Sequence, residues 1–88
     1  MPRFFFHVFN GLGHIGDEEG QDLEDQAEAR RTAIDSVRSM VSEDVRAGTI
    51  DLCGRIEVMD AEENVLVTVN YPEAFELLLP ATEGDRTQ

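Results

Sequence analysis

The stretch that decides the fold is residues 25–48, which read DQAEARRTAIDSVRSMVSEDVRAG. Its apolar residues recur at spacings of three and four, which places them on one stripe of a helix. Asp25 is a suitable N-cap with Glu28 three residues later, and Gly48 can take the left-handed conformation that ends a helix. We therefore expect one amphipathic helix from about Gln26 to Ala47. The stripe consists of Ala29, Ala33, Ile34, Val37, Met40, Val41 and Val45.

Strand signals lie on both sides of this helix. Residues 3–9 are almost all aromatic, β-branched or histidine and end at the turn signal Asn10-Gly11, and residues 21–23 are suited to a short strand that pairs with them. After the helix, residues 55–59 and 65–69 alternate around a polar turn, and Pro72 stops the second strand. The predicted order is ββαββ. We expect an α+β, two-layer sandwich, with one long amphipathic helix on a three- to four-stranded antiparallel sheet.

The length of 88 residues fits one domain, which we place at residues 1–79, with a polar, disordered tail at residues 80–88. Domains this small often gain stability from disulfides, metals or oligomerisation. Cys53 is the only cysteine, so no disulfide forms within the chain, and we expect a reducing compartment. The apolar run at residues 4–9 is too short for a signal peptide or a membrane span, so we expect a cytoplasmic protein.

The charge is strongly negative, with 19 acidic residues against 7 basic ones and a net charge of −12. Such a surface repels phosphate backbones and anionic membranes, so we expect neither nucleic-acid binding nor membrane binding. A basic protein partner stays open, and so does mimicry of a nucleic acid, whose binding would weaken as salt rises.

The opening residues Met1-Pro2-Arg3-Phe4-Phe5-Phe6-His7-Val8 resemble the start of a family of small bacterial proteins of unknown function. Those proteins begin Met-Pro-Arg-Tyr/Phe-Phe/Tyr-Phe-His. The resemblance continues through Asp17-Glu18-Glu19-Gly20, the Ala- and Arg-rich helix and residues 54–58, and so covers roughly residues 1–70. It implies a short cytoplasmic bacterial protein without an established activity or accepted catalytic residues. Phe4 stands where that family often has Tyr, which removes a hydroxyl.

No motif predicts a catalytic residue, a metal site or a cofactor. His7 and His14 flank a hairpin turn, but their spacing matches no recognised zinc pattern. The acidic residues from Asp17 onward lack the glycine of a calcium-binding EF-hand loop at its sixth position. The glycines at 11, 13 and 16 lead into acidic sequence instead of the helix that a dinucleotide site requires. Cys53 follows a helix C-terminus, so we expect an unreactive, partly buried thiol.

The first strand is apolar on both faces, which a single helix cannot cover. Phe4, Phe6 and Val8 share one face, while Phe5 and Phe9 lie with His7 on the other. Residues 72–79 cover this second face, a partner chain covers it, or it stays exposed, and the sequence does not decide among these. We expect a non-enzymatic interaction or self-association module, a homodimer joined through this face or a strand edge. Its interface candidates are Phe5, His7, Phe9 and Met59.

An alternative interpretation centres on His7. Its ordinary pKa lies near physiological pH, so it is suited to acid–base chemistry or ligand binding. Arg55 and Glu57 would be its polar partners in a small ligand-binding or enzymatic site.

Overall fold

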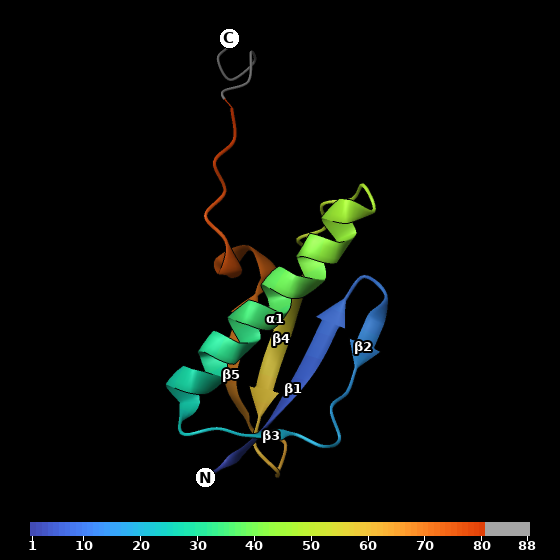
Figure 1. Ribbon diagram of the computed structural model, residues 1–88. Coiled ribbons are helices and arrows are strands. Elements are labelled where there is room, and N and C mark those ends of the chain that lie inside the picture. The colour runs from blue at the N-terminus through green and yellow to red at the C-terminus, as the bar shows by residue number, and fades with distance from the viewer. Residues whose placement is uncertain (81–88) are drawn as a thin grey trace.

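The computed structural model describes residues 1–80, in which strands precede and follow one long helix (Figure 1). The predicted tail, residues 80–88, lies outside the described residues except for Pro80. The strands are β1 (Arg3–Asn10), β2 (Gly13–Ile15), β3 (Gln21–Asp22), β4 (Gly54–Met59) and β5 (Val65–Asn70), the helix is α1 (Gln26–Arg46), and a 3₁₀ turn, η1 (Tyr71–Ala74), follows β5. The predicted α+β class, with an antiparallel sheet packed on a helix, is confirmed.

The sheet is antiparallel throughout, in the order β2-β1-β4-β5. As predicted, a short strand before the helix pairs with β1, with Arg3 opposite Asp22. The sequence analysis missed β2, which forms a tight hairpin with β1 and places His14 opposite Phe9. Gly13 begins β2 at a φ of 123°, a conformation that few other residues adopt. The glycines around residues 13–15 are typical of a loop, so the sequence did not indicate this strand.

The predicted helix bounds agree with those observed. The Asp25 side chain accepts a hydrogen bond from the Glu28 backbone N–H at 2.9 Å, as an N-cap does. The Glu28 carboxylate reaches back to the Glu24 N–H at 2.8 Å, one residue before the position that a capping box uses. Gly48 has a φ of 101° just beyond the helix, which confirms its role in ending α1.

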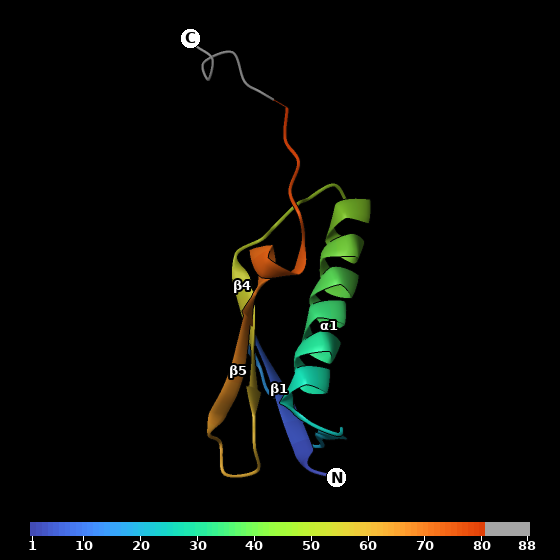
Figure 2. The same cartoon turned by 90° about the vertical axis from the view of Figure 1, so that its left-hand side faces the viewer.

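The core lies between α1 and the sheet face that carries Phe4, Ile56, Val58 and Val69. Four residues of the predicted stripe are buried there, namely Ala29, Ala33, Val37 and Val41. Ile34 and Met40 are half-buried at its border. Val45 is 47 % exposed, because the last turn of α1 extends past the end of the sheet (Figure 2). Strict alternation would place Leu66 on the same face as Thr68, but the pairing of β4 with β5 shifts at Val58/Met59 and Leu66 packs against the core.

The segment after β5 closes one end of this core and then leaves the domain. Tyr71 and Ala74 are buried, and the Arg38 Nε donates a hydrogen bond to the Ala74 carbonyl at 2.8 Å. Beyond Phe75 the chain extends away from both layers (Figures 1 and 2), and Leu78 and Leu79 are 82 % and 81 % exposed. The described residues after β5 therefore do not cover the second sheet face. Within residues 1–80, no helix is long and apolar enough to cross a bilayer.

Candidate functional site

The sheet face turned away from α1 carries every site residue that the sequence predicted. Phe5 lies opposite Met59, His7 opposite Glu57, and Phe9 opposite Arg55 on the paired strands β1 and β4. All six side chains are half-buried. The interface candidates and the alternative ligand site thus occupy the same surface. We call this surface the outer face; it consists of Phe5, His7, Phe9, Arg55, Glu57 and Met59 with His14 of β2.

Phe9 is the centre of a stack that crosses three strands. Its ring is parallel to that of His14, with an interplanar angle of 2° and centroids 4.4 Å apart. On the β4 side, the Arg55 guanidinium carbon lies 4.3 Å from the Phe9 centroid, in a cation–π contact. The Arg55 Nε also contacts the Glu57 Oε2 at 2.8 Å. Since the Arg55 charge is paired within the face, the middle of the outer face is aromatic and nearly neutral.

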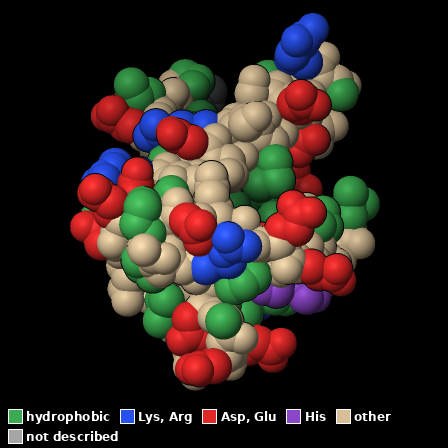
Figure 3. Space-filling model, turned by 60° about the horizontal axis from the view of Figure 1, so that its bottom comes forward, with side chains coloured by type: hydrophobic (Ala, Val, Ile, Leu, Met, Phe, Trp, Pro, Cys, Tyr) green, Lys and Arg blue, Asp and Glu red, His purple; other side chains and the backbone are tan. Residues whose placement is uncertain are grey.

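His7 and His14 meet beside this stack. The Nδ1 of His7 lies 3.3 Å from the Nε2 of His14, and the ring centroids are 5.5 Å apart. Figure 3 shows the histidine side chains at the surface, next to acidic side chains. The sequence placed the two histidines on either side of a hairpin turn. Their contact depends on β2, because only the pairing of His14 with Phe9 brings His14 diagonally across from His7.

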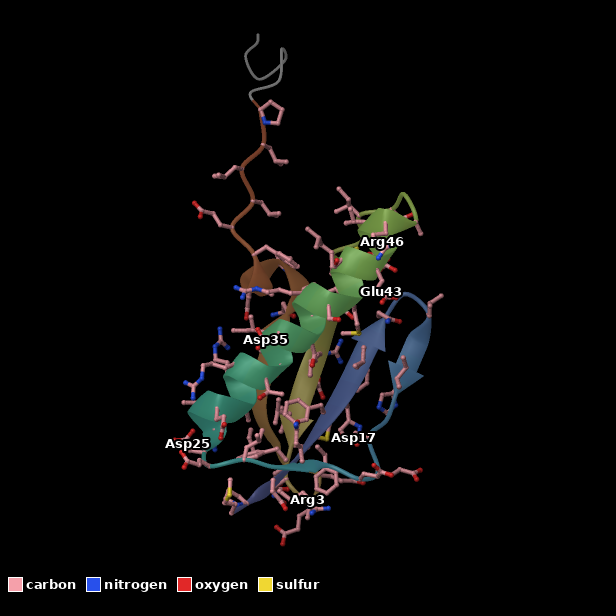
Figure 4. The ribbon with its side chains drawn as sticks, in the orientation of Figure 1. Arg3, Asp17, Asp25, Asp35, Glu43 and Arg46 are labelled. Carbon is pink, nitrogen blue, oxygen red and sulfur yellow. The ribbon has the colours of Figure 1, made fainter. Side chains whose placement is uncertain are left out.

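Asp17 organises the edge of the outer face. Between the pairs Val8–Ile15 and Phe4–Gln21, residues 5–7 of β1 face the longer segment 16–20, so regular pairing is interrupted. The Asp17 Oδ2 accepts a hydrogen bond from the Phe6 N–H at 2.9 Å, and its Oδ1 accepts from Gly20 at 3.1 Å and Glu19 at 3.2 Å. Figure 4 shows Asp17 beside β1, where β2 has ended. The Asp17 carboxylate thus accepts the backbone hydrogen bond that a neighbouring strand would accept in a continuous sheet.

These contacts change the pKa of Asp17. Partial burial raises that pKa, but the three backbone N–H donors and the nearby His7 outweigh burial and lower it below its ordinary value. The sequence analysis considered the acidic residues from Asp17 onward only as calcium ligands and assigned them no structural role. The sequence analysis missed the spacing from Asp17 to Gly20 as a sign of a structured turn. Gly20 has a φ of 72°, and a Cβ at this position would lie 2.7 Å from the Arg3 side chain and 2.8 Å from the Phe5 ring.

A surface hollow of about 390 Å³ borders the outer face. Its walls include Phe5 and His7 together with the carboxylates of Asp17, Glu18, Asp60 and Glu63, and they contain no arginine. A larger hollow of about 600 Å³ lies between the end of α1 and the turn after β1, and it contains none of the predicted site residues. The hollow beside His7 is suited to a cation and repels an anionic ligand.

Cys53 lies in the connection between α1 and β4, where it lines a surface hollow of about 440 Å³ together with Phe9 and Arg55 of the outer face. The thiol is exposed, so the prediction of a partly buried cysteine was wrong. The backbone of this connection is held locally, because the Asp51 carboxylate accepts a hydrogen bond from the Cys53 N–H at 2.9 Å. Within residues 1–80, no group of three or more His, Cys, Asp or Glu side chains is arranged to hold a metal ion.

Comparison with known proteins gives one match. The family model described as a domain of unknown function, DUF6894, matches residues 3–72, which span β1 to the start of η1. No curated protein and no solved structure matches the chain. The expected resemblance to a family without an established function is therefore confirmed.

Proposed function

The chain belongs to the DUF6894 family of domains of unknown function, and we propose that it is a small non-enzymatic self-association module. Two copies meet through the outer face. The observation that supports this proposal is an aromatic sheet face that the described residues leave uncovered.

The outer face has the composition of a contact surface. Phe5, Phe9 and Met59 are half-buried, and α1 packs only on the opposite face (Figure 2). A second sheet packed about 10 Å away would remove these side chains from water. A domain of this size has a small core, so burial of further apolar area contributes substantially to its stability.

The charge distribution of the outer face is compatible with binding a second copy of the chain. Two molecules of net charge −12 repel each other at most orientations. The middle of the outer face avoids this repulsion, because Arg55 and Glu57 form an ion pair on each copy. A two-fold axis would bring the same neutral patch of both copies together, as a closed dimer requires.

The test replaces Phe9 by Glu, which places a charge in the middle of the outer face. The expected result is a higher monomer fraction in light scattering across a concentration range, with the helical circular dichroism retained. Ile15→Glu is the matched control, because Ile15 is 57 % exposed and pairs with Val8, on the face opposite Phe9. An unchanged mass for a folded Phe9→Glu protein rules out the outer face as the interface.

A second candidate function is a ligand site at His7, and the adjoining hollow favours it. Arg55 and Glu57 are its proposed polar partners, although their mutual ion pair leaves less of either charge for a ligand. His7→Ala separates the two proposals. The substitution abolishes ligand binding and leaves dimerisation intact if His7 serves a ligand, whereas it weakens the dimer if His7 lies in the interface.

A further inference from the structure

The two histidines of this chain are brought together by β1 and β2, which follow each other in the sequence and pair as a hairpin. Each ring has a nitrogen facing the other, and the two nitrogens are 3.3 Å apart. We propose that His7 and His14 form a two-imidazole site for a divalent transition-metal ion of the zinc class, with water in the remaining coordination positions. The proposal does not require a second copy of the chain.

The distance between the two nitrogens fits chelation. Zinc–imidazole bonds of about 2.0–2.1 Å at a tetrahedral angle place two donor nitrogens roughly 3.3–3.4 Å apart. The observed separation of the His7 Nδ1 and the His14 Nε2 is 3.3 Å. This separation is also slightly longer than that of a good hydrogen bond, so little direct bonding is lost when a metal ion takes both lone pairs.

The surroundings hold both rings in place before any ion binds. The parallel contact with Phe9 fixes the plane of the His14 ring. Beneath the pair lies Gly16, where a Cβ would come 3.8 Å from His7 and 3.9 Å from His14. A Cβ at this position would make only ordinary van der Waals contact with the two rings, and the pairing of β1 with β2 sets their spacing. Because the ligands are already ordered, binding requires little loss of side-chain freedom.

The local charge favours a cation. The hollow that contains His7 is walled by Asp17, Glu18, Asp60 and Glu63 without a basic side chain, and its negative potential concentrates metal ions. Imidazole selects among those ions, since nitrogen ligands suit zinc, copper and nickel, whereas magnesium and calcium prefer oxygen. The described residues supply no group of three or more ligands, so we expect exchangeable binding instead of a permanent structural ion.

The test follows imidazole ¹⁵N signals by NMR during a titration with Zn²⁺. His7 and His14 are the only histidines in the sequence, so every imidazole signal reports on the proposed site. Both rings are expected to shift together and to saturate at one Zn²⁺ per chain. Calcium is the control for general association with carboxylates, and it should shift neither ring. Light scattering on the same samples separates zinc binding from any change in self-association.

The variant His14→Phe completes the test, because Phe retains an aromatic ring for the stack on Phe9 while it removes the ligand. Its His7 signal should no longer saturate at Zn²⁺ concentrations that saturate the unaltered chain. Shifts confined to one ring, no shift at all, or equal zinc binding by folded His14→Phe would each overturn the proposal. The zinc titration uses the unaltered chain and His14→Phe and does not use Phe9→Glu, so the outcome of the self-association test leaves its result standing and the two proposals fail independently.

Discussion

A single carboxylate, that of Asp17, performs a task that usually needs a strand. It accepts hydrogen bonds from Phe6 across the gap in the sheet and from Glu19 and Gly20 in its own loop. Such charge-assisted bonds to backbone N–H groups are stronger than neutral ones. Asp17 therefore stabilises the edge of β1 and also fixes the loop that forms the surface beside His7.

Replacement of Asp17 by Asn should reduce the free energy of unfolding by about 1–2 kcal/mol, because the amide keeps the size of the side chain but loses a charged acceptor. The lowered pKa of Asp17 sets the pH dependence. Its contribution is complete above the unfolded pKa of about 3.9 and is lost as the pH falls through the lower folded value. Urea unfolding should therefore show a smaller loss of stability below about pH 4 for Asp17→Asn than for the unaltered chain. Parallel curves for the two proteins would contradict this role.

The elements differ in how far local sequence determines them. Helix α1 could be predicted to within a residue, because its apolar spacing, its Asp25 cap and Gly48 all lie within the stretch itself. Strand β2 could not, since Gly13-His14-Ile15 has little strand character and becomes a strand only by pairing with β1. The outer face followed from the alternation in residues 3–9. The contact between His14 and His7 could not be predicted, because it depends on β2.

The stripe of α1 offers a matched pair of substitutions. Val37 is 0 % exposed and Val45 is 47 % exposed, although both belong to the same predicted stripe. Val37→Ala should reduce the free energy of unfolding by about 2 kcal/mol, because it leaves a cavity against the sheet. Val45→Ala should change it by less than about 0.5 kcal/mol, as expected for a surface site. Chemical denaturation measures the free energy of unfolding of the two variants. Equal losses for both would contradict the prediction, because Val45 would then have to be buried like Val37.

At the scale of the whole molecule, two apolar surfaces lack a partner within residues 1–80. One is the outer face, and the other is the extended segment with Leu77, Leu78 and Leu79, which are 51 %, 82 % and 81 % exposed. This segment lies beyond the matched region, residues 3–72. The family match therefore does not extend to it.

The double substitution Leu78→Ser with Leu79→Ser tests which of these two surfaces mediates self-association. The melting temperature should stay the same, because neither leucine belongs to the core. The mass in solution should also stay the same, because we place the self-association interface on the outer face. A fall to monomer with an unchanged melting temperature would move the interface to the C-terminal segment.

The interruption at Asp17 also limits how the sheet can grow. An open edge invites further strands, and a sheet with two open edges can extend without end. On the β1 side, the edge is divided into β2 of three residues and β3 of two, with a charged loop between them. On the other side, β5 offers six residues that pair only with β4 among the described strands. If β5 paired with a second copy, only the interrupted edges would stay open, so strand addition would end at a pair instead of leading to a fibre.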